Sequence, residues 1–269
     1  MEIAPSEQRP HSGAVLEQEL EVAIEAARRA GGEVARMREE GLRYGRKGGY
    51  ELVSEADIHA AEILHEALTG AFPDYGWLSE EHRDTAERLD RERVWVVDPI
   101  DGTREYLQGH SEYAISVGLV VKGRPALGVV YNPATDEMHA AVCPDPAPEA
   151  VPDGEQEGDY LALVSRGEDM LGEVPPLPGQ ARTRGVGSVA YRLALVAAGR
   201  GDVVVTWYAR QEWDVAAGAA LCLAKGLVFS DVVGQPIEFN QPRPVVRGLL
   251  VAEAGLHARI SEYFRRIAR

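Results

Sequence analysis

The hydrophobic and polar positions along the chain first follow a helical spacing. Over residues 14–38, apolar side chains recur at that spacing with charged residues between them, which predicts an amphipathic helix. The glycine-rich stretch at 41–51, "GLRYGRKGGYE", breaks the pattern and predicts a turn or hairpin. Ser54 and Asp57 then have the spacing of a capping box, so we expect a second helix from there to about Leu68.

The rest of the chain mixes strand patterns with helix patterns. Short runs rich in β-branched and aromatic residues predict strands at 77–81, 93–97, 113–121, 126–133, 136–142, 160–165, 202–207, 227–231 and 247–253. Longer runs with helical spacing predict helices at 189–199, 213–226 and 256–269. The segment 82–93 carries both signs of charge and is expected to be solvated. Such mixing is typical of an α/β (α+β) fold whose helices and sheets stack in layers.

Two stretches poor in core-forming residues divide the chain. Residues 1–13 lack the apolar core of a signal peptide and are expected to be a disordered tail. Residues 143–159 are rich in proline and acidic side chains, which predicts a linker or long loop. We therefore expect an N-terminal α+β part over 14–150 and a C-terminal α/β part over 151–269, packed as one compact unit.

Composition narrows the classes of function. The 269 residues are 45% hydrophobic, which is enough for a large core. The formal net charge of -15 argues against binding to long nucleic acids, because such a surface repels them. No apolar run is long enough to span a bilayer, so we expect no membrane association. Cys143 and Cys222 lack metal-type spacing, and we interpret them as reduced thiols of a cytoplasmic protein, with Cys222 in a helix core.

The stretch "DPIDGT", residues 98–103, crowds two acids against the end of a predicted buried strand. Pro99 fixes its own φ angle and holds the preceding residue in extended backbone. This would turn Asp98, the Ile100 carbonyl and Asp101 toward one point. Oxygen ligands of this kind suit a hard divalent cation such as Mg2+. The alternative interpretation is an ordinary strand-to-helix turn in which Asp98 is a cap.

Further residues extend this candidate site. Gly102 lets another group approach the backbone closely, and a helix beginning at Thr103 would offer free N–H groups to a phosphate. Glu80 and Glu81 end a predicted strand upstream, and Asp214 in "EWDVAAG" begins a predicted helix. Taken singly, the two glutamates are interpreted as surface acids and Asp214 as a helix N-cap.

Taken together and in this order, "LSEE", "DPIDGTREY" and "EWDVAAG" resemble the inositol monophosphatase superfamily of Mg2+-dependent, lithium-sensitive phosphatases. The resemblance covers nearly the whole chain. It implies a layered α/β/α/β/α sandwich with the active site between the N-terminal and C-terminal parts. It also implies a small phosphorylated substrate, attack by metal-activated water and, as in many relatives, a homodimer.

The resemblance assigns roles to individual residues. It implies two or three Mg2+ ions, held by Glu80, Asp98, the Ile100 carbonyl, Asp101 and Asp214. It implies that Thr103 orients the attacking water, with an upstream acid as its partner. The corresponding upstream segment is "ELVSEAD" in this chain, which puts Glu51 in the position of that acid and leaves Asp57 as a helix cap.

The motifs identify the alcohol part of the substrate less directly. "SEE", "DGTREY" and Glu212 resemble the CysQ-type branch, whose members hydrolyse 3'-phosphoadenosine 5'-phosphate to AMP and phosphate. Inositol monophosphatases carry a glutamate that contacts inositol seven residues before the helix-start aspartate, where this chain has Trp207. An indole ring cannot accept those hydrogen bonds, but it can stack on a purine. The alternative is that Trp207 is a packed strand residue.

Other substrate contacts are expected from the residues Gly102, Thr103, Ser188 and Arg210, with Tyr208 and Arg192 as further candidates. The length of the helical segment at 189–199 is instead typical of inositol monophosphatases, so inositol 1-phosphate is the alternative substrate. Fructose 1,6-bisphosphate is a more distant one. A non-catalytic sensor on the same scaffold is an alternative of another class. It is disfavoured because all four acidic metal ligands are present.

Overall fold

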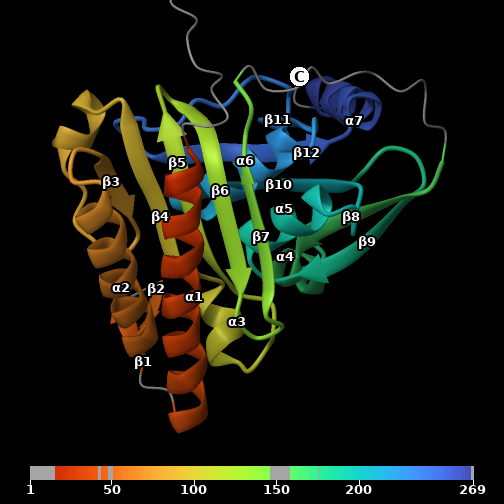
Figure 1. The fold of residues 1–269 in the computed structure, drawn as a ribbon. Helices are drawn as coiled ribbons and strands as arrows, with labels where there is room; N and C mark the ends of the chain where they lie inside the picture. Colours follow the sequence, from red (N-terminus) through yellow and green to blue (C-terminus); the bar gives the residue numbers. More distant parts are fainter. Residues whose placement is uncertain (1–15, 42–43, 48–50, 146–157, 175, 268–269) are drawn as a thin grey trace, which may run out of the picture.

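The structure is a computed structural model that describes residues 16–41, 44–47, 51–145, 158–174 and 176–267. The predicted tail at 1–13 and most of the predicted linker at 143–159 lie outside the described residues. Two five-stranded sheets alternate with three layers of helices (Figure 1). Among the described helices, none combines the length and the apolar character that crossing a bilayer requires.

The first sheet is covered on its outer face by two helices, α1 (Glu17–Glu40) and α2 (Glu55–Ala71). Its strand order is β3-β4-β5-β6-β7. The strands are β3 (Gly76–Ser79), β4 (Arg93–Asp101), β5 (Ala114–Val121), β6 (Arg124–Asn132) and β7 (Glu137–Val142). The β3–β4 pair is parallel and the other pairs are antiparallel. Alanines of both helices pack against Trp95 and its apolar neighbours, because small side chains let a helix approach a sheet closely.

The second sheet has the order β11-β12-β10-β8-β9. Its strands are β8 (Tyr160–Ser165), β9 (Ala181–Val186), β10 (Val203–Gln211), β11 (Val228–Ser230) and β12 (Val245–Ala252). Helix α7 (Ala254–Ile267) covers the outer face of this sheet, where Leu256, Ile260 and Phe264 are buried. These layers confirm the predicted α/β/α/β/α sandwich.

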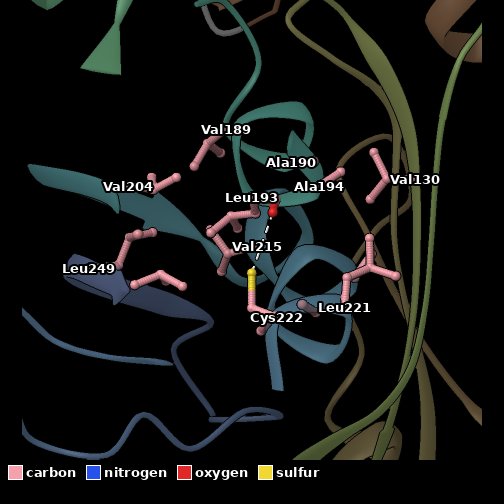
Figure 2. Close-up of a cluster of buried hydrophobic side chains, with 14 of the residues drawn as sticks. Val130, Val189, Ala190, Leu193, Ala194, Val204, Val215, Leu221, Cys222 and Leu249 are labelled. Atoms are coloured by element: carbon pink, nitrogen blue, oxygen red, sulfur yellow. Dashed lines mark hydrogen bonds between the residues drawn. The ribbon is translucent and has the colours of Figure 1, made fainter. Parts of the chain in front are cut away.

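The middle layer consists of α5 (Val189–Ala197) and α6 (Glu212–Ala224). Both helices are buried on almost every side, because a sheet packs on each of their two faces. Figure 2 shows part of this core, including Cys222, whose thiol donates to the Leu193 carbonyl at 3.4 Å. The prediction that Cys222 lies in a helix core is confirmed, and neither Cys143 nor Cys222 forms a disulfide within the described chain.

Two glycines let α6 rest directly on the first sheet. Gly118 of β5 and Gly128 of β6 face each other across the strand pair. A Cβ atom at Gly128 would lie 2.1 Å from the Ala217 carbonyl oxygen, and one at Gly118 would lie 3.0 Å from the Ala216 Cβ. The backbone of α6 therefore occupies the space that side chains would fill at these two positions.

Local signals near the amino terminus are confirmed. The antiparallel pair β1 (Tyr44–Lys47) and β2 (Glu51–Ser54) forms the hairpin predicted for 41–51. Helix α2 begins after Ser54, which forms the predicted capping box with Asp57. The predicted helix at 14–38 corresponds to α1, although its first two residues lie outside the described ranges.

Three short elements differ from the prediction. Residues Ala86–Asp90 form a 3-10 helix, η2, inside the segment that we expected to be solvated, and Arg166–Leu171 form the short helix α4. Strand β9, "ARTRGV", lies at the edge of the second sheet, and most of its side chains are not buried. An edge strand needs no alternation of apolar and polar residues, so its sequence carries little strand signal.

We expect Gly128→Ala to destabilise the protein by about 1–3 kcal/mol, because the added methyl group forces α6 away from the sheet. The matched control is Gly32→Ala in α1, where a Cβ would meet no atom within 4 Å. That change should leave stability unchanged or raise it by up to about 1 kcal/mol, because alanine favours a helix. Urea unfolding measures both changes, and equal midpoints for the two variants would contradict the close packing.

Candidate active site

A large cavity lies where the ends of β3 and β4 meet the beginnings of α5 and α6. Its volume is about 1000 Å³. The predicted metal ligands Glu80, Asp98, Ile100, Asp101 and Asp214 all line it, as do the predicted substrate contacts Gly102, Thr103, Ser188 and Arg210. The fold therefore brings together three motifs that are far apart in the sequence.

The end of β4 is irregular, and this irregularity places its two aspartates at the cavity. The pairing of β4 with β5 is regular through Asp98 and shifts before Asp101. Pro99 has no N–H to donate to a neighbouring strand, which is a physical reason for the break. Asp98 Oδ1 instead accepts a hydrogen bond from the Ile100 N–H at 2.9 Å, so the carboxylate is fixed over its own turn.

Asp101 and Asp214 are each oriented by groups at the beginning of a middle-layer helix. Asp101 Oδ2 accepts hydrogen bonds from Ser188 Oγ and from the Ala190 N–H, both at 2.6 Å. Asp214 Oδ2 accepts one from the Gln211 N–H at 3.0 Å. Ser188 has a φ of 49°, in the left-handed region where non-glycine residues are strained, and such strain gathers at functional sites. Ser188 Oγ thus contacts a predicted metal ligand, and it also accepts a hydrogen bond from the Tyr191 N–H at 3.0 Å as the N-cap of α5.

The acidic residues of the cavity repel one another. Burial raises the pKa of Asp98 well above its ordinary value, and the charges of its acidic neighbours raise it further. The pKa of Asp214 is also raised well above the ordinary value, first by burial and then by Asp101 and Glu80. A bound cation would stabilise such a cluster, because its charge offsets both the burial and the repulsion.

Helix α3 (Thr103–Leu107) begins beside these carboxylates. It follows Gly102, whose φ of 98° lies in the left-handed region that glycine favours. The Thr103 hydroxyl lies 2.9 Å from Asp57 Oδ1 and 3.1 Å from the Ile100 carbonyl oxygen. The hydroxyl can therefore donate its hydrogen to Asp57 and still accept a hydrogen bond from a further group in the cavity.

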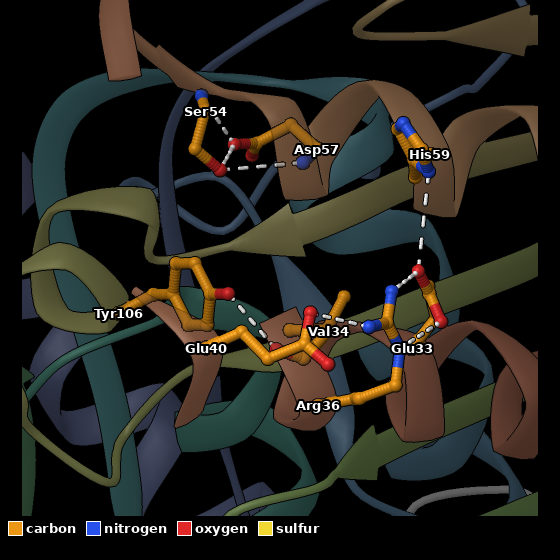
Figure 3. A network of polar contacts seen from close by, with 8 residues as sticks. All are labelled: Glu33, Val34, Arg36, Glu40, Ser54, Asp57, His59 and Tyr106. Atoms are coloured by element: carbon orange, nitrogen blue, oxygen red, sulfur yellow. Dashed lines mark hydrogen bonds and ion pairs between the residues drawn. The ribbon is translucent and has the colours of Figure 1, made fainter. Parts of the chain in front are cut away.

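Asp57 has a second contact besides the predicted helix cap. Figure 3 shows its capping contacts with Ser54, whose N–H donates to Asp57 Oδ2 at 2.7 Å. The other oxygen, Oδ1, accepts from the Thr103 hydroxyl. Burial raises the pKa of Asp57, and the hydrogen bonds from Ser54 and Thr103 partly offset that rise. The side chain of Glu51, which we assigned as the partner of Thr103, lies outside the described residues, so that assignment stays a prediction.

Four arginines line the cavity, Arg83, Arg104, Arg192 and Arg210, and we call the interacting pair Arg192 and Arg210 the arginine wall. Arg192 is 2% exposed, and its Nε and Nη1 atoms have no hydrogen-bond partner in the described part of the chain. Burial and the charge of Arg210 lower the pKa of Arg192 to about 10, so it stays charged at neutral pH. Arg210 Nη2 donates to Glu168 Oε1 at 2.8 Å. Two interacting guanidinium charges at the wall of a cavity favour the binding of an anion there.

Trp207 is not among the residues that line the cavity, so the structure does not place it where the predicted stacking on a purine would need it. Its ring lies against Phe264 of α7, with centroids 4.6 Å apart, in the outer core. The cause is the alternation of side chains along β10. Thr206 contacts Arg210 on the cavity side, so the next residue faces the opposite layer. The alternative, a packed strand residue, is confirmed. Tyr208 is likewise not among the lining residues.

The inositol monophosphatase family model matches residues 15–268. The chain belongs to the inositol monophosphatase family. The CysQ 3'(2'),5'-bisphosphate nucleotidase of Salmonella typhimurium is 31% identical over 234 residues, which cover 82% of this chain and 94% of the relative. The inositol-1-monophosphatase of Rhizobium meliloti is 35% identical over 238 residues, which cover 81% and 88%. The suhB crystal structure from Bartonella henselae matches with a TM-score of 0.73 and 26% identity over 93% and 99% of the two chains.

A member of this family with such relatives is a phosphatase, a phosphoric monoester hydrolase of the inositol monophosphatase and CysQ type. Family members are generally metal-dependent. The donors of the cavity fit a divalent cation in kind, because its buried carboxylates and the Ile100 carbonyl are hard oxygen ligands. Among the described residues, however, no three acidic, histidine or cysteine side chains are grouped so that they could hold a metal ion.

We expect Asp98→Asn to have opposite effects with and without metal. Without metal the variant should be more stable at neutral pH, on the order of 1 kcal/mol, because it removes a buried charge whose raised pKa marks it as unfavourable. A folded-state pKa above the unfolded value means that the carboxyl stabilises the fold when protonated. Wild-type stability therefore falls as the pH rises past the ordinary Asp range, and the variant should show less of this fall.

Thermal unfolding in chelator and in Mg2+, at about pH 5 and about pH 8, measures these effects. Mg2+ should raise the Tm of the wild type and leave that of Asp98→Asn unchanged. A metal-free variant that is less stable than the wild type at the higher pH would contradict the electrostatic account.

Proposed function

We propose that the protein is an Mg2+-dependent, lithium-sensitive phosphomonoesterase that converts 3'-phosphoadenosine 5'-phosphate to AMP and phosphate. The observation that carries the choice of substrate is the arginine wall. Arg192 is buried at the wall of the cavity with unsatisfied N–H groups, and Arg210 lies close enough to lower its pKa. A substrate with a second phosphate would bring a further negative charge to these two guanidinium groups, whereas a monophosphate would not.

The residues of the chain have complementary roles in this reaction. The carboxylates would hold Mg2+, which supplies Lewis-acid stabilisation of the phosphoryl group and lowers the pKa of water. Thr103, with its hydrogen donated to Asp57, would accept a hydrogen bond from the attacking water and so orient it. The backbone N–H groups at the beginning of α3 would stabilise charge on the phosphoryl oxygens. The water oxygen bonds to phosphorus as the ester P–O bond breaks, and the leaving oxygen takes up a proton.

Inositol 1-phosphate is the second candidate, supported by the 35% identity to the inositol-1-monophosphatase of Rhizobium meliloti. The position that would carry an inositol-binding glutamate holds Trp207, which packs in the outer core. The chain thus lacks an acceptor for inositol hydroxyls at that position, and this favours the nucleotide.

Phosphate release from three substrates tests the proposal. We expect kcat/KM to be largest for 3'-phosphoadenosine 5'-phosphate, lower for 3'-AMP, which lacks only the second phosphate, and lowest for inositol 1-phosphate. A charged hydrogen bond contributes roughly 1.5–3 kcal/mol, which predicts about 10-fold to 100-fold between the two nucleotides. A preference for inositol 1-phosphate would refute the nucleotidase assignment and leave the phosphatase assignment intact.

The variant Arg192→Met tests the arginine wall directly. It should lower kcat/KM for 3'-phosphoadenosine 5'-phosphate about 10-fold or more and change that for 3'-AMP much less, because only the first substrate has the second phosphate. The control Arg29→Met removes an exposed arginine of α1 and should change neither value. An equal loss with both nucleotides would show that Arg192 supports the fold of the site and does not bind the second phosphate.

A further inference from the structure

A second polar network lies beside the cavity and takes no part in the proposed reaction. Its centre is Arg88 of η2, which is 2% exposed. Arg88 Nε and Nη2 donate to the two oxygens of Asp84, at 2.6 and 2.8 Å. Its Nη1 donates to Asn240 Oδ1 at 2.7 Å and its Nη2 to the Gln241 carbonyl at 3.0 Å. Arg88 therefore joins a loop next to the first sheet to a loop that precedes β12.

Glu212 holds the same loop from the other side. It is the first residue of α6 and is 1% exposed. Its carboxylate accepts hydrogen bonds from the Asn240 N–H at 2.7 Å and the Gln241 N–H at 3.0 Å. Its own N–H donates to the Pro244 carbonyl at 3.0 Å. Residues 240–241 thus accept hydrogen bonds from Arg88 on one side and donate hydrogen bonds to Glu212 on the other, and both of these charged side chains are buried. We call the set Asp84, Arg88, Asn240, Gln241 and Glu212 the Arg88–Glu212 clamp.

The two ends of the clamp are connected along the chain to predicted metal ligands that come from different layers. Arg88 packs against Gly76 at the beginning of β3, the strand that ends one residue before Glu80. Asp84, which Arg88 holds with both nitrogens, belongs to the loop that follows Glu80 and also lines the cavity. Glu212 lies two residues before Asp214 on the first turn of α6. The clamp therefore connects the β3 side of the cavity to the α6 side.

We propose that the Arg88–Glu212 clamp positions Glu80 against Asp214 and thereby sets the affinity of the site for its divalent cation. The proposal rests on the proposed metal site. The acidic ligands repel one another, and the clamp adds a polar connection between the loop that follows Glu80 and the first turn of α6, beside the packing of α6 on the first sheet. An arginine fork on a carboxylate and a carboxylate on two backbone N–H groups are contacts with strict geometry, which suits that task. Arg88 and Glu212 are positioning residues, because they act through the loops they hold.

Mg2+ binding without substrate tests the proposal by isothermal titration calorimetry. Arg88→Met removes the guanidinium fork, and Glu212→Gln replaces one acceptor oxygen by an NH2 group of nearly equal size. We expect the Kd for Mg2+ to rise about 10-fold in each variant, the lower end of what supporting residues contribute at metal sites. The double variant should show less than the product of the two single effects, because both side chains act through residues 240–241.

The matched controls are Arg91→Met and Glu238→Gln, which make the same chemical changes at exposed positions near each end of the clamp. Both should keep the wild-type Kd. Unfolding of the metal-free proteins distinguishes a purely structural role of the clamp from an effect on Mg2+ affinity. If the clamp variants lose stability but bind Mg2+ with the wild-type Kd, the proposal is overturned and the metal site stands. If the wild type itself binds no Mg2+, both the clamp proposal and the proposed metal site are refuted. If Arg88→Met fails to fold, the Kd for Mg2+ of the near-isosteric variant Glu212→Gln tests the proposal.

Discussion

The mutual repulsion of the buried carboxylates is the constraint on which the active site depends. Asp98, Asp101 and Asp214 each have a pKa raised by burial, so each is less stable in its charged form than it would be in water. The fold does not reduce this unfavourable free energy by exposing the three carboxylates to solvent. It fixes one oxygen of each with an N–H or hydroxyl donor instead, and the sandwich around them supplies the stability that the site lacks.

The middle layer is where that stability is concentrated. Helix α6 carries Asp214 on its first turn and is packed between two sheets, so its position is determined from both sides. Gly118 and Gly128 bring its backbone onto the first sheet, the sheet that carries Asp98 and Asp101. The same close contact that builds the core thus fixes the spacing between ligands of different motifs.

The sequence patterns predicted those features of the fold and the site that neighbouring residues determine. The capping box at Ser54, the irregular end of β4 after Pro99 and the carboxylates of the three motifs are set by neighbouring residues, and the resemblance of the motifs predicted the layered fold. The sequence patterns could not predict contacts between segments that are distant in the chain. A strand residue such as Trp207 faces one layer or the other according to its partner sheet, and single-sequence alternation does not say which. The contacts of Arg88 with Asn240 join loops whose proximity only the packed sheets create.

The cavity contains acidic and basic side chains, and each kind partly offsets the charge of the other. A chain with a net charge of -15 repels a phosphorylated substrate at long range, so the attraction has to be local. Arg192 and Arg210 provide it, and both also lower the pKa of Asp101, which partly offsets its burial. The acids nevertheless keep raised pKa values, and Arg192 keeps unsatisfied N–H groups. A cation relieves the first imbalance and an anion the second. The proposed pair of a divalent cation and a doubly phosphorylated ester would therefore offset both kinds of charge in the cavity, whereas either one alone would offset only one kind.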